Sequence, residues 1–151
     1  MAGEIIELII PGQPKAQKRH RTGKGGQRYD PSKADKGMLR RWMLKIKPAT
    51  PIDYPVIIEI DAFFQTPTSW SEAKKERYEG KYRAKTPDSD NVEKIIFDSM
   101  NKYIVEDDKL IVDNHTRRFY SVKPCTHIRL RPAPFDSVAP EFEPKQKQII
   151  P

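Results

Sequence analysis

The residues whose types and spacing could carry chemistry are aspartates in two short segments. Asp88 and Asp90 are separated by one residue, and Asp107 and Asp108 form a pair further along the chain. Pro87 favours an extended backbone in the residue before it, and alternate side chains of an extended chain point the same way. We therefore expect Asp88 and Asp90 to project to one side. A helix and a short turn would bring the later pair back beside them.

Gathered carboxylates favour a bound cation, because three of them held together without one would force at least one to keep a proton. Their hard oxygen atoms suit Mg²⁺ or Mn²⁺. Such an ion can acidify a bound water and stabilise charge on a phosphate during an in-line displacement. Lys94 lies one helical turn after Asp90 and Asn91, so it can reach the same patch and offset charge that develops on the phosphate.

The same residues also have a purely structural interpretation. An Asp-x-Asp-Asn sequence is frequent at the start of a helix, and Glu-Asp-Asp is frequent in turns. A calcium loop of the EF-hand type is a poor fit, because Glu93 occupies the sixth position from Asp88, where that loop needs glycine. Spacing alone leaves both metal catalysis and helix capping open.

Charge is distributed unevenly along the 151 residues, whose formal net charge is +7. Residues 1–50 carry 12 basic and 4 acidic side chains, whereas residues 88–113 carry 8 acidic and 3 basic ones. This pattern is expected where one part of a domain holds a polyanion and another holds metal cations. The candidate phosphate contacts lie in the basic segment that precedes the first helix: Lys15, Lys18, Arg19 and Arg21.

The hydrophobic pattern predicts the elements that must position these residues. Apolar and polar side chains alternate from Val56 to Phe64, as in a strand with one buried face. Asp90 or Asn91 can cap a helix with an apolar stripe, and Ser69 has capping-box spacing to Glu72 at the start of a short basic helix over 72–78. We also expect a helix from 30 to 46, a loop over 13–27, and strands over 4–10, 110–112, 117–122 and 127–131.

This order of elements predicts an α+β fold with a mixed β-sheet packed against helices. The expected domain covers residues 1–131. The tail over 132–151 contains five prolines and is expected to be extended or disordered.

Composition excludes several classes of protein. No apolar run approaches the ~18 residues that a membrane span needs, and the N-terminus lacks the basic and apolar regions of a secretory signal. The single cysteine, Cys125, excludes an internal disulfide framework and a cysteine-based zinc site. The three histidines have no metal-ligand spacing. We therefore expect a small, basic, cytoplasmic protein.

At the acidic motif the sequence resembles the RusA family of Holliday junction resolvases, which is common in bacteria and their phages. The similar segments are Pro87-Asp88-Ser89-Asp90-Asn91-Val92-Glu93-Lys94, then Asp98-Ser99-Met100-Asn101, then Val105-Glu106-Asp107-Asp108-Lys109-Leu110-Ile111. The resemblance covers roughly residues 4–131, since the N-terminal strand, the basic loop and the lysine-rich helix are also similar.

The resemblance implies an Mg²⁺-dependent endonuclease that acts as a homodimer and nicks two strands of a four-way DNA junction during recombination and repair. It implies metal-binding carboxylates at Asp88, Asp90 and Asp108, with Asp107 as the alternative third ligand. It further implies a catalytic role for Lys94. Asn91 matches the family's asparagine and is interpreted as a positioning group at the DNA.

Two other functions agree with the same residues. One is a protein of this fold that binds branched DNA without cutting it, and the other is a nuclease that acts on other branched intermediates. Some family members place aromatic residues before the acidic motif to open the junction centre. In this chain Tyr78 and Tyr82 are the aromatic residues available there.

Overall fold

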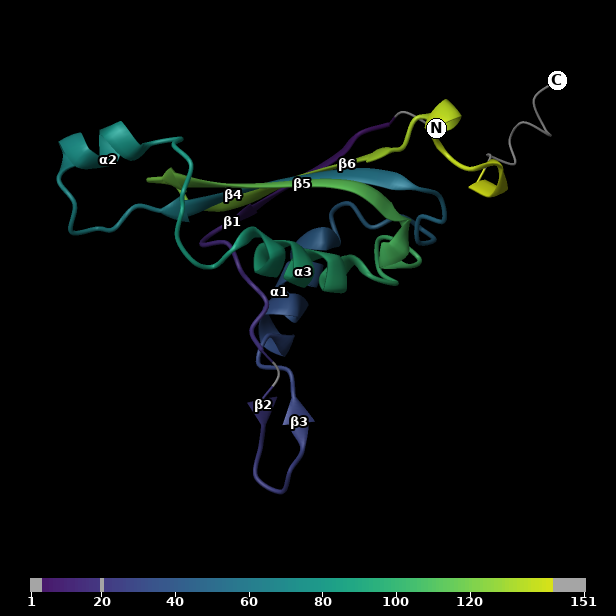
Figure 1. Ribbon diagram of the computed structural model, residues 1–151, viewed down its shortest axis with the longest axis horizontal. Coiled ribbons are helices and arrows are strands. Elements are labelled where there is room, and N and C mark those ends of the chain that lie inside the picture. Colours follow the sequence, from purple (N-terminus) through teal and green to yellow (C-terminus); the bar gives the residue numbers. More distant parts are fainter. Residues whose placement is uncertain (1–3, 20, 143–151) are drawn as a thin grey trace.

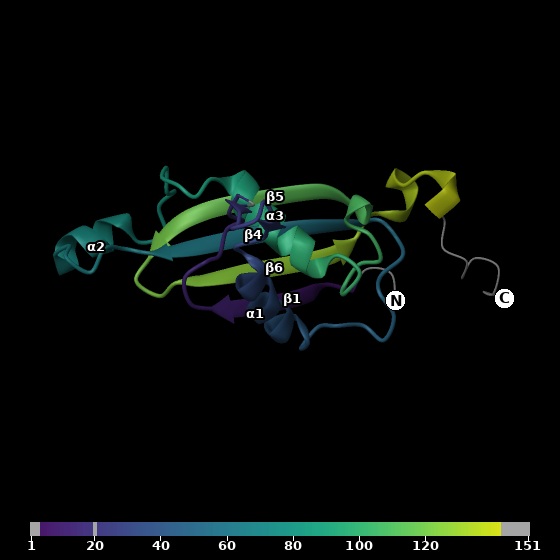
Figure 2. The same ribbon diagram turned by 90° about the horizontal axis from the view of Figure 1, so that it is seen from below.

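A mixed four-stranded sheet forms the body of the structure, a computed structural model that describes residues 4–19 and 21–142 (Figure 1). Neighbouring strands are antiparallel except the pair β4 (Val56–Gln65) and β5 (Ile111–Ser121), which runs parallel. Two helices, α1 (Lys33–Met43) and α3 (Ser89–Met100), cover one face of the sheet (Figure 2). The predicted α+β fold is confirmed. The strand order is β1 (Ile6–Pro11), β6 (Cys125–Pro132), β4 (Val56–Gln65) and β5 (Ile111–Ser121).

The core lies between this sheet and the two helices. Strand β4 contributes alternate apolar side chains, and Ile58, Ile60 and Phe64 are at most 1% exposed. This confirms the alternation predicted for 56–64. Helix α3 presents its apolar stripe to the same core, and Ile95 and Met100 are fully buried.

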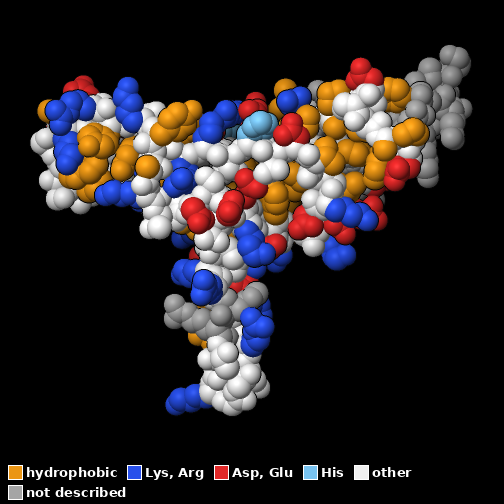
Figure 3. Space-filling model, in the orientation of Figure 1, with side chains coloured by type: hydrophobic (Ala, Val, Ile, Leu, Met, Phe, Trp, Pro, Cys, Tyr) orange, Lys and Arg blue, Asp and Glu red, His pale blue; other side chains and the backbone are white. Residues whose placement is uncertain are grey.

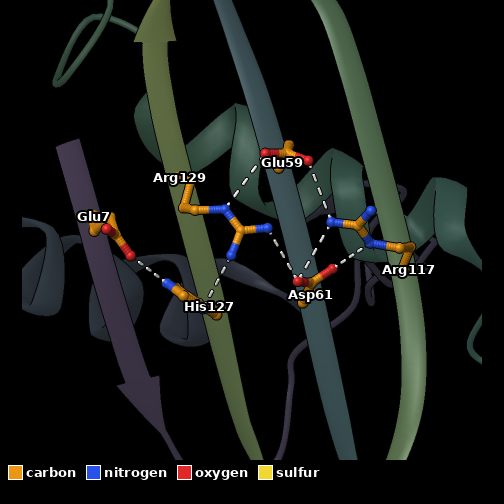
Figure 4. A network of polar contacts seen from close by, with 6 residues as sticks. All are labelled: Glu7, Glu59, Asp61, Arg117, His127 and Arg129. Carbon is orange, nitrogen blue, oxygen red and sulfur yellow. Dashed lines mark hydrogen bonds and ion pairs between the residues drawn. The ribbon is translucent and has the colours of Figure 1, made fainter. Parts of the chain in front are cut away.

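The opposite face of the sheet carries a network of charged side chains instead of a second layer of helices (Figure 4). Arg117 donates to Asp61 at 2.6 Å, and Arg129 reaches Glu59 at 3.4 Å and Asp61 at 3.3 Å. Burial alone would raise the pKa of the Glu59 carboxyl. The cations of Arg129 and Arg117 outweigh burial and leave that pKa below its usual value. The charges on this face therefore compensate one another.

Strand β5 is one continuous strand, so the prediction of two strands over 110–112 and 117–122 is wrong. The polar residues between them, 113–116, show no apolar alternation, yet they pair in register with β4. Strand β5 is an edge strand whose residues 112–115 are exposed, so pairing rather than burial holds this part of it.

The predicted loop over 13–27 contains a short hairpin, made of β2 (Arg21–Thr22) and β3 (Arg28–Tyr29). Gly25 and Gly26 both have positive φ angles, which lets the chain turn sharply between the two strands. The hairpin projects away from the helical face (Figure 1). The loop is therefore a structured projection whose base also contacts the domain, since Gln17 is buried.

Helix α2 (Glu72–Tyr78) has the predicted bounds, but its cap is Ser71 rather than Ser69. The Ser71 hydroxyl accepts a hydrogen bond from the Lys74 N–H at 3.2 Å. In the tail, residues 133–142 contain two short 3₁₀ turns, Phe135–Ser137 and Pro140–Phe142. Within the described residues, no helix has the length and apolar character needed to cross a membrane.

We predict that Ile95→Ala lowers the free energy of unfolding by about 2–5 kcal/mol, because it leaves a cavity between α3 and the sheet. Val112→Ala is the matched control, since Val112 is 57% exposed, and it should change stability by less than about 0.5 kcal/mol. Denaturant unfolding measures both. Equal losses in the two variants would contradict this assignment of the core.

Candidate active site

Helix α3 carries the acidic motif at its N-terminal end. Asp88 is the N-cap, and its Oδ1 accepts a hydrogen bond from the Asn91 N–H at 3.1 Å. The expectation that Asp88 and Asp90 project together from an extended chain is therefore wrong, because Ser89 and Asp90 are already helical. The helix also begins earlier than the predicted cap at Asp90 or Asn91. Capping and chemistry are compatible at Asp88, whose second carboxylate oxygen has no hydrogen bond to any described residue.

An open acidic pocket of about 260 Å³ lies on the exposed side of α3. Asp90 and Lys94 face it, as their positions one turn apart predict. Asp108 joins them because the turn after α3 returns the chain, where the Asn101 side-chain oxygen accepts a hydrogen bond from the Asp108 N–H at 3.0 Å. The full lining is Asp90, Glu93, Lys94, Phe97, Asp98 and Asp108.

Asp107 and Asp108 have different roles. The Asp107 carboxylate caps the short 3₁₀ turn Asp108–Leu110 by accepting a hydrogen bond from the Lys109 N–H at 2.9 Å. Asp108 lines the acidic pocket, and Asp107 does not. The geometry thus favours Asp108 as the partner of Asp90.

Two further carboxylates in this pocket were not among the predicted site residues. Glu93 accepts hydrogen bonds from Asn114 at 2.5 Å and from Thr116 at 2.6 Å, which fixes it against β5. Asp98 lies 3.8 Å from the Lys94 ammonium. Helical spacing could have revealed both, since Glu93 follows Asp90 by three residues and Asp98 follows Lys94 by four.

Lys94 is held by a chain of ion pairs that reaches helix α1. Asp98 pairs with Lys94 and also, at 3.4 Å, with Lys36. Lys36 in turn donates to Asp30 at 2.6 Å. The Lys94 side chain is nevertheless 59% exposed, so it is oriented but open to a ligand.

A second, basic groove of about 530 Å³ adjoins the acidic pocket, and Lys94 lines both. Its lining comes from the basic segment, from β3 and from α3: Gln17, Lys18, Arg19, Arg28, Asn91 and Lys94. Of the predicted phosphate contacts, Lys18, Arg19 and Asn91 thus come together. Lys15 instead lies 3.8 Å from Asp35, outside the groove lining. The side chain of Arg21 lies outside the described part of the chain.

The basic segment is anchored rather than free. The Gln17 backbone N–H donates to the Asn91 carbonyl at 2.9 Å, which ties the segment to the first turn of α3. The Lys18 N–H donates to the Ser32 hydroxyl at 2.8 Å. Asp30 accepts from Gln17 and from the Ser32 N–H. The hydrogen bond from Lys36 is the main cause that lowers the pKa of Asp30 to about 2.

The donor chemistry of the acidic pocket fits a hard divalent cation. Among residues 4–19 and 21–142, no three Asp, Glu, His or Cys side chains are close enough to form a metal site without rearrangement. Mg²⁺, however, commonly binds through only one or two carboxylates and completes its shell with water and substrate phosphate. Asp90 and Asp108 supply two such carboxylates on one pocket.

We predict that Asp30→Asn lowers the melting temperature at pH 6. The folded-state pKa of Asp30 lies below its usual value, so its ionised form stabilises the fold above about pH 4 and this contribution is lost as the pH falls toward 2. The difference in melting temperature between wild type and variant should therefore decrease as the pH falls from about 4 to 2. Thermal unfolding from pH 6 to pH 2 measures it, with Asp53→Asn, an exposed aspartate, as the control. A difference that does not depend on pH would contradict the assignment.

Comparison with known proteins gives a family match over most of the chain. The family model described as endodeoxyribonuclease RusA matches residues 11–131, a span that includes the basic groove and the whole acidic pocket. A search of curated proteins finds none that matches the chain. The family consists of nucleases that resolve Holliday junctions. The chain belongs to the RusA family of endodeoxyribonucleases.

Proposed function

We propose that this chain is an Mg²⁺-dependent endonuclease that resolves four-way DNA junctions by paired nicks. The observation that carries the proposal is the position of Lys94, which lines both the acidic pocket and the basic groove. A DNA phosphate held by cations in the groove would lie next to the carboxylates of the pocket. This is the juxtaposition that metal-assisted phosphodiester hydrolysis requires.

Asp88, Asp90 and Asp108 are proposed to hold the metal, with Mg²⁺ as the expected ion and Mn²⁺ as a substitute. When bound, the ion would activate a water and stabilise the charge of the displacement. Asp90 and Asp108 would contribute from the pocket lining. Asp88 does not line the pocket, so its carboxylate oxygen that does not cap α3 would have to move toward the other two for all three to bind one ion. Glu93 and Asp98 complete the acidic wall and, through Asp98, orient Lys94.

Lys94 and Asn91 are proposed to act on the phosphate itself. Lys94 can donate to a non-bridging oxygen as negative charge develops there, and its ammonium is oriented in advance by Asp98. Asn91 lines the basic groove from the first turn of α3 and would position the backbone. Lys18, Arg19 and Arg28 neutralise the neighbouring phosphates. Lys15 and Arg21, from the same basic segment, are proposed as further phosphate contacts.

A second copy of the chain is part of the proposal. The described residues contain one acidic pocket with this lining, and one pocket can cut one strand at a time. A four-way junction has two-fold symmetry, so two related sites in a homodimer can make paired nicks.

Cleavage tests the catalytic assignment. We predict that Asp90→Asn lowers the rate of nicking of a labelled four-way junction in Mg²⁺ by about 10²–10³-fold, because it removes a charged ligand from the reacting centre. Binding of the junction should persist. Glu106→Gln is the matched control, since Glu106 is an exposed acid near Asp108 that does not line the pocket.

Three results would overturn parts of this proposal. Equal cutting by wild type and Asp90→Asn would exclude the metal assignment. A wild-type protein that binds the junction tightly but does not cut it would identify a non-catalytic branched-DNA-binding protein, and preferred cutting of flaps would identify another branched substrate.

The basic groove is tested by salt dependence. We predict that replacing Lys18 and Arg19 by alanine lowers the slope of log affinity against log salt by about 1.8, which corresponds to two lost phosphate contacts. The ratio of wild-type to variant affinity should then fall by about tenfold as the salt concentration rises from 50 to 200 mM. The control replaces Lys47 and Arg131, which are exposed and lie outside the groove. A slope unchanged by the first pair would place the DNA elsewhere.

A further inference from the structure

Helix α2 lies beyond one end of the sheet and buries none of its residues (Figure 1). A seven-residue helix with no buried side chain gains little from hydrophobic burial. Its position must therefore be fixed by other contacts. We name residues 70–85, which contain α2 and the segment after it, the α2 arm.

Hydrogen bonds fix the α2 arm to the end of β5. The Gly80 N–H donates to the Tyr120 carbonyl, the Tyr120 N–H donates to the Lys81 carbonyl, and the Arg83 N–H donates to the Arg118 carbonyl, each at 2.9 Å. Residues 80–83 thus extend the sheet by a short antiparallel pairing beside β5. The Glu79 carboxylate adds two bonds, from the Ser121 hydroxyl at 2.7 Å and from the Val122 N–H at 2.8 Å.

Aromatic rings complete the attachment. Trp70 lies 4.6 Å from Tyr78 and 5.8 Å from Tyr120, measured between ring centroids. The Lys74 ammonium sits over the Trp70 ring at 4.2 Å. The arm therefore has a defined geometry, although it projects into solvent.

The α2 arm carries uncompensated positive charge. Residues 72–85 include six Lys or Arg and three Glu. Of the acids, Glu72 pairs with Lys75 at 3.4 Å and Glu79 is bonded to β5. Three exposed cations have no ion pair or side-chain hydrogen bond among the described residues: Arg77, Lys81 and Lys85. Figure 3 shows the cluster of Lys and Arg side chains over α2.

The arm and the basic hairpin are two separate basic projections, and the first turn of α3 lies at the base of the hairpin. In Figure 1, α2 lies beyond the end of the sheet, and the β2–β3 hairpin projects from the helical face. Figure 3 shows acidic side chains between these two basic projections. The connection from the arm to α3 is also fixed, since Arg118 donates to the carbonyls of Lys85 and Pro87 and to the Ser89 hydroxyl.

We propose that the α2 arm is a second DNA-contact surface, which binds the phosphate backbone of a duplex arm beyond the end of the sheet, away from the hairpin. The inference rests on the proposed function and deepens it. Phosphate backbone is the occupant that the charges favour, because long exposed cations on a fixed support neutralise phosphates without reading sequence. A protein partner would be expected to bury a patch of apolar surface, but Tyr82 is the one largely exposed ring of the arm, since Trp70 and Tyr78 pack on each other and on Tyr120.

The test removes the three unpaired cations together. For Arg77→Ala, Lys81→Ala and Lys85→Ala combined, the slope of log affinity against log salt should fall by about 2.7 for both a four-way junction and a linear duplex. The ratio of wild-type to variant affinity should then fall by about 40-fold as the salt concentration rises from 50 to 200 mM. Binding is measured in EDTA, where strand cutting does not interfere, and melting temperature confirms that the variant folds.

Two matched variants complete the design. The triple replacement of Lys45, Lys47 and Arg131 by alanine removes the same charge from exposed positions outside the arm and should leave the slope within about one contact of the wild-type value. The second variant keeps the charge and should preserve the wild-type slope; it combines Arg77→Lys, Lys81→Arg and Lys85→Arg.

The outcomes separate this inference from the proposed function. A wild-type slope in the arm variant, or an equal fall in the control triple, overturns the arm contact even if the wild type cuts junctions. Failure of the wild type to cut overturns the proposed nuclease, whereas the slope on bound duplex still decides the arm contact. An arm variant that changes from dimer to monomer in sedimentation, with its slope unchanged, identifies a protein interface and overturns the proposal.

Discussion

The packing of α3 against the sheet is the constraint on which the site depends. A helix repeats every 3.6 residues, so burying Val92, Ile95 and Ile96 turns Asp90 and Lys94 outward. Arg40 strengthens this arrangement from α1 by donating to the carbonyls of Asp98 and Ser99 near the end of α3. The chemistry is therefore positioned by a rigid element rather than by a loop.

The parallel pairing of β4 and β5 explains why so many functional residues lie in one connection. Parallel neighbours cannot be joined by a tight hairpin, so the chain must cross the sheet, commonly through a helix. Here the crossover spans 66–110 and contains the α2 arm, α3 and the turn to Asp108. One topological requirement thus brings the basic arm, the acidic pocket and Lys94 into a single segment.

Local patterns predicted the elements well, whereas non-local contacts could not be predicted. Alternation identified β4, and helical spacing placed Asp90, Asn91 and Lys94 on one helix. The continuity of β5 depends on pairing with β4, and the anchoring of the basic segment depends on a hydrogen bond from Gln17 to Asn91. In both cases the interacting residues lie far apart in the sequence, so no local pattern predicts the contact. Asp88 was expected to project beside Asp90 from an extended chain, but Asp88 caps α3 by accepting from the Asn91 N–H, so the chain is already helical at Asp90.

The basic and acidic parts of the sequence form separate surfaces in the fold. The two surfaces meet at Lys94, which lines both the basic groove and the acidic pocket. Four carboxylates line the acidic pocket, so DNA backbone is repelled from it unless cations nearby offset the repulsion. Cations in the groove alone would hold the backbone at one place and leave its direction across the pocket free. With the basic groove at the start of α3 and the proposed contact of the α2 arm beyond the end of the sheet, the DNA would be attracted at two separate places, which restricts how its backbone can lie near the carboxylates. Both surfaces are attached to the domain by fixed contacts. This matters because cations on flexible segments would follow the DNA instead of positioning it.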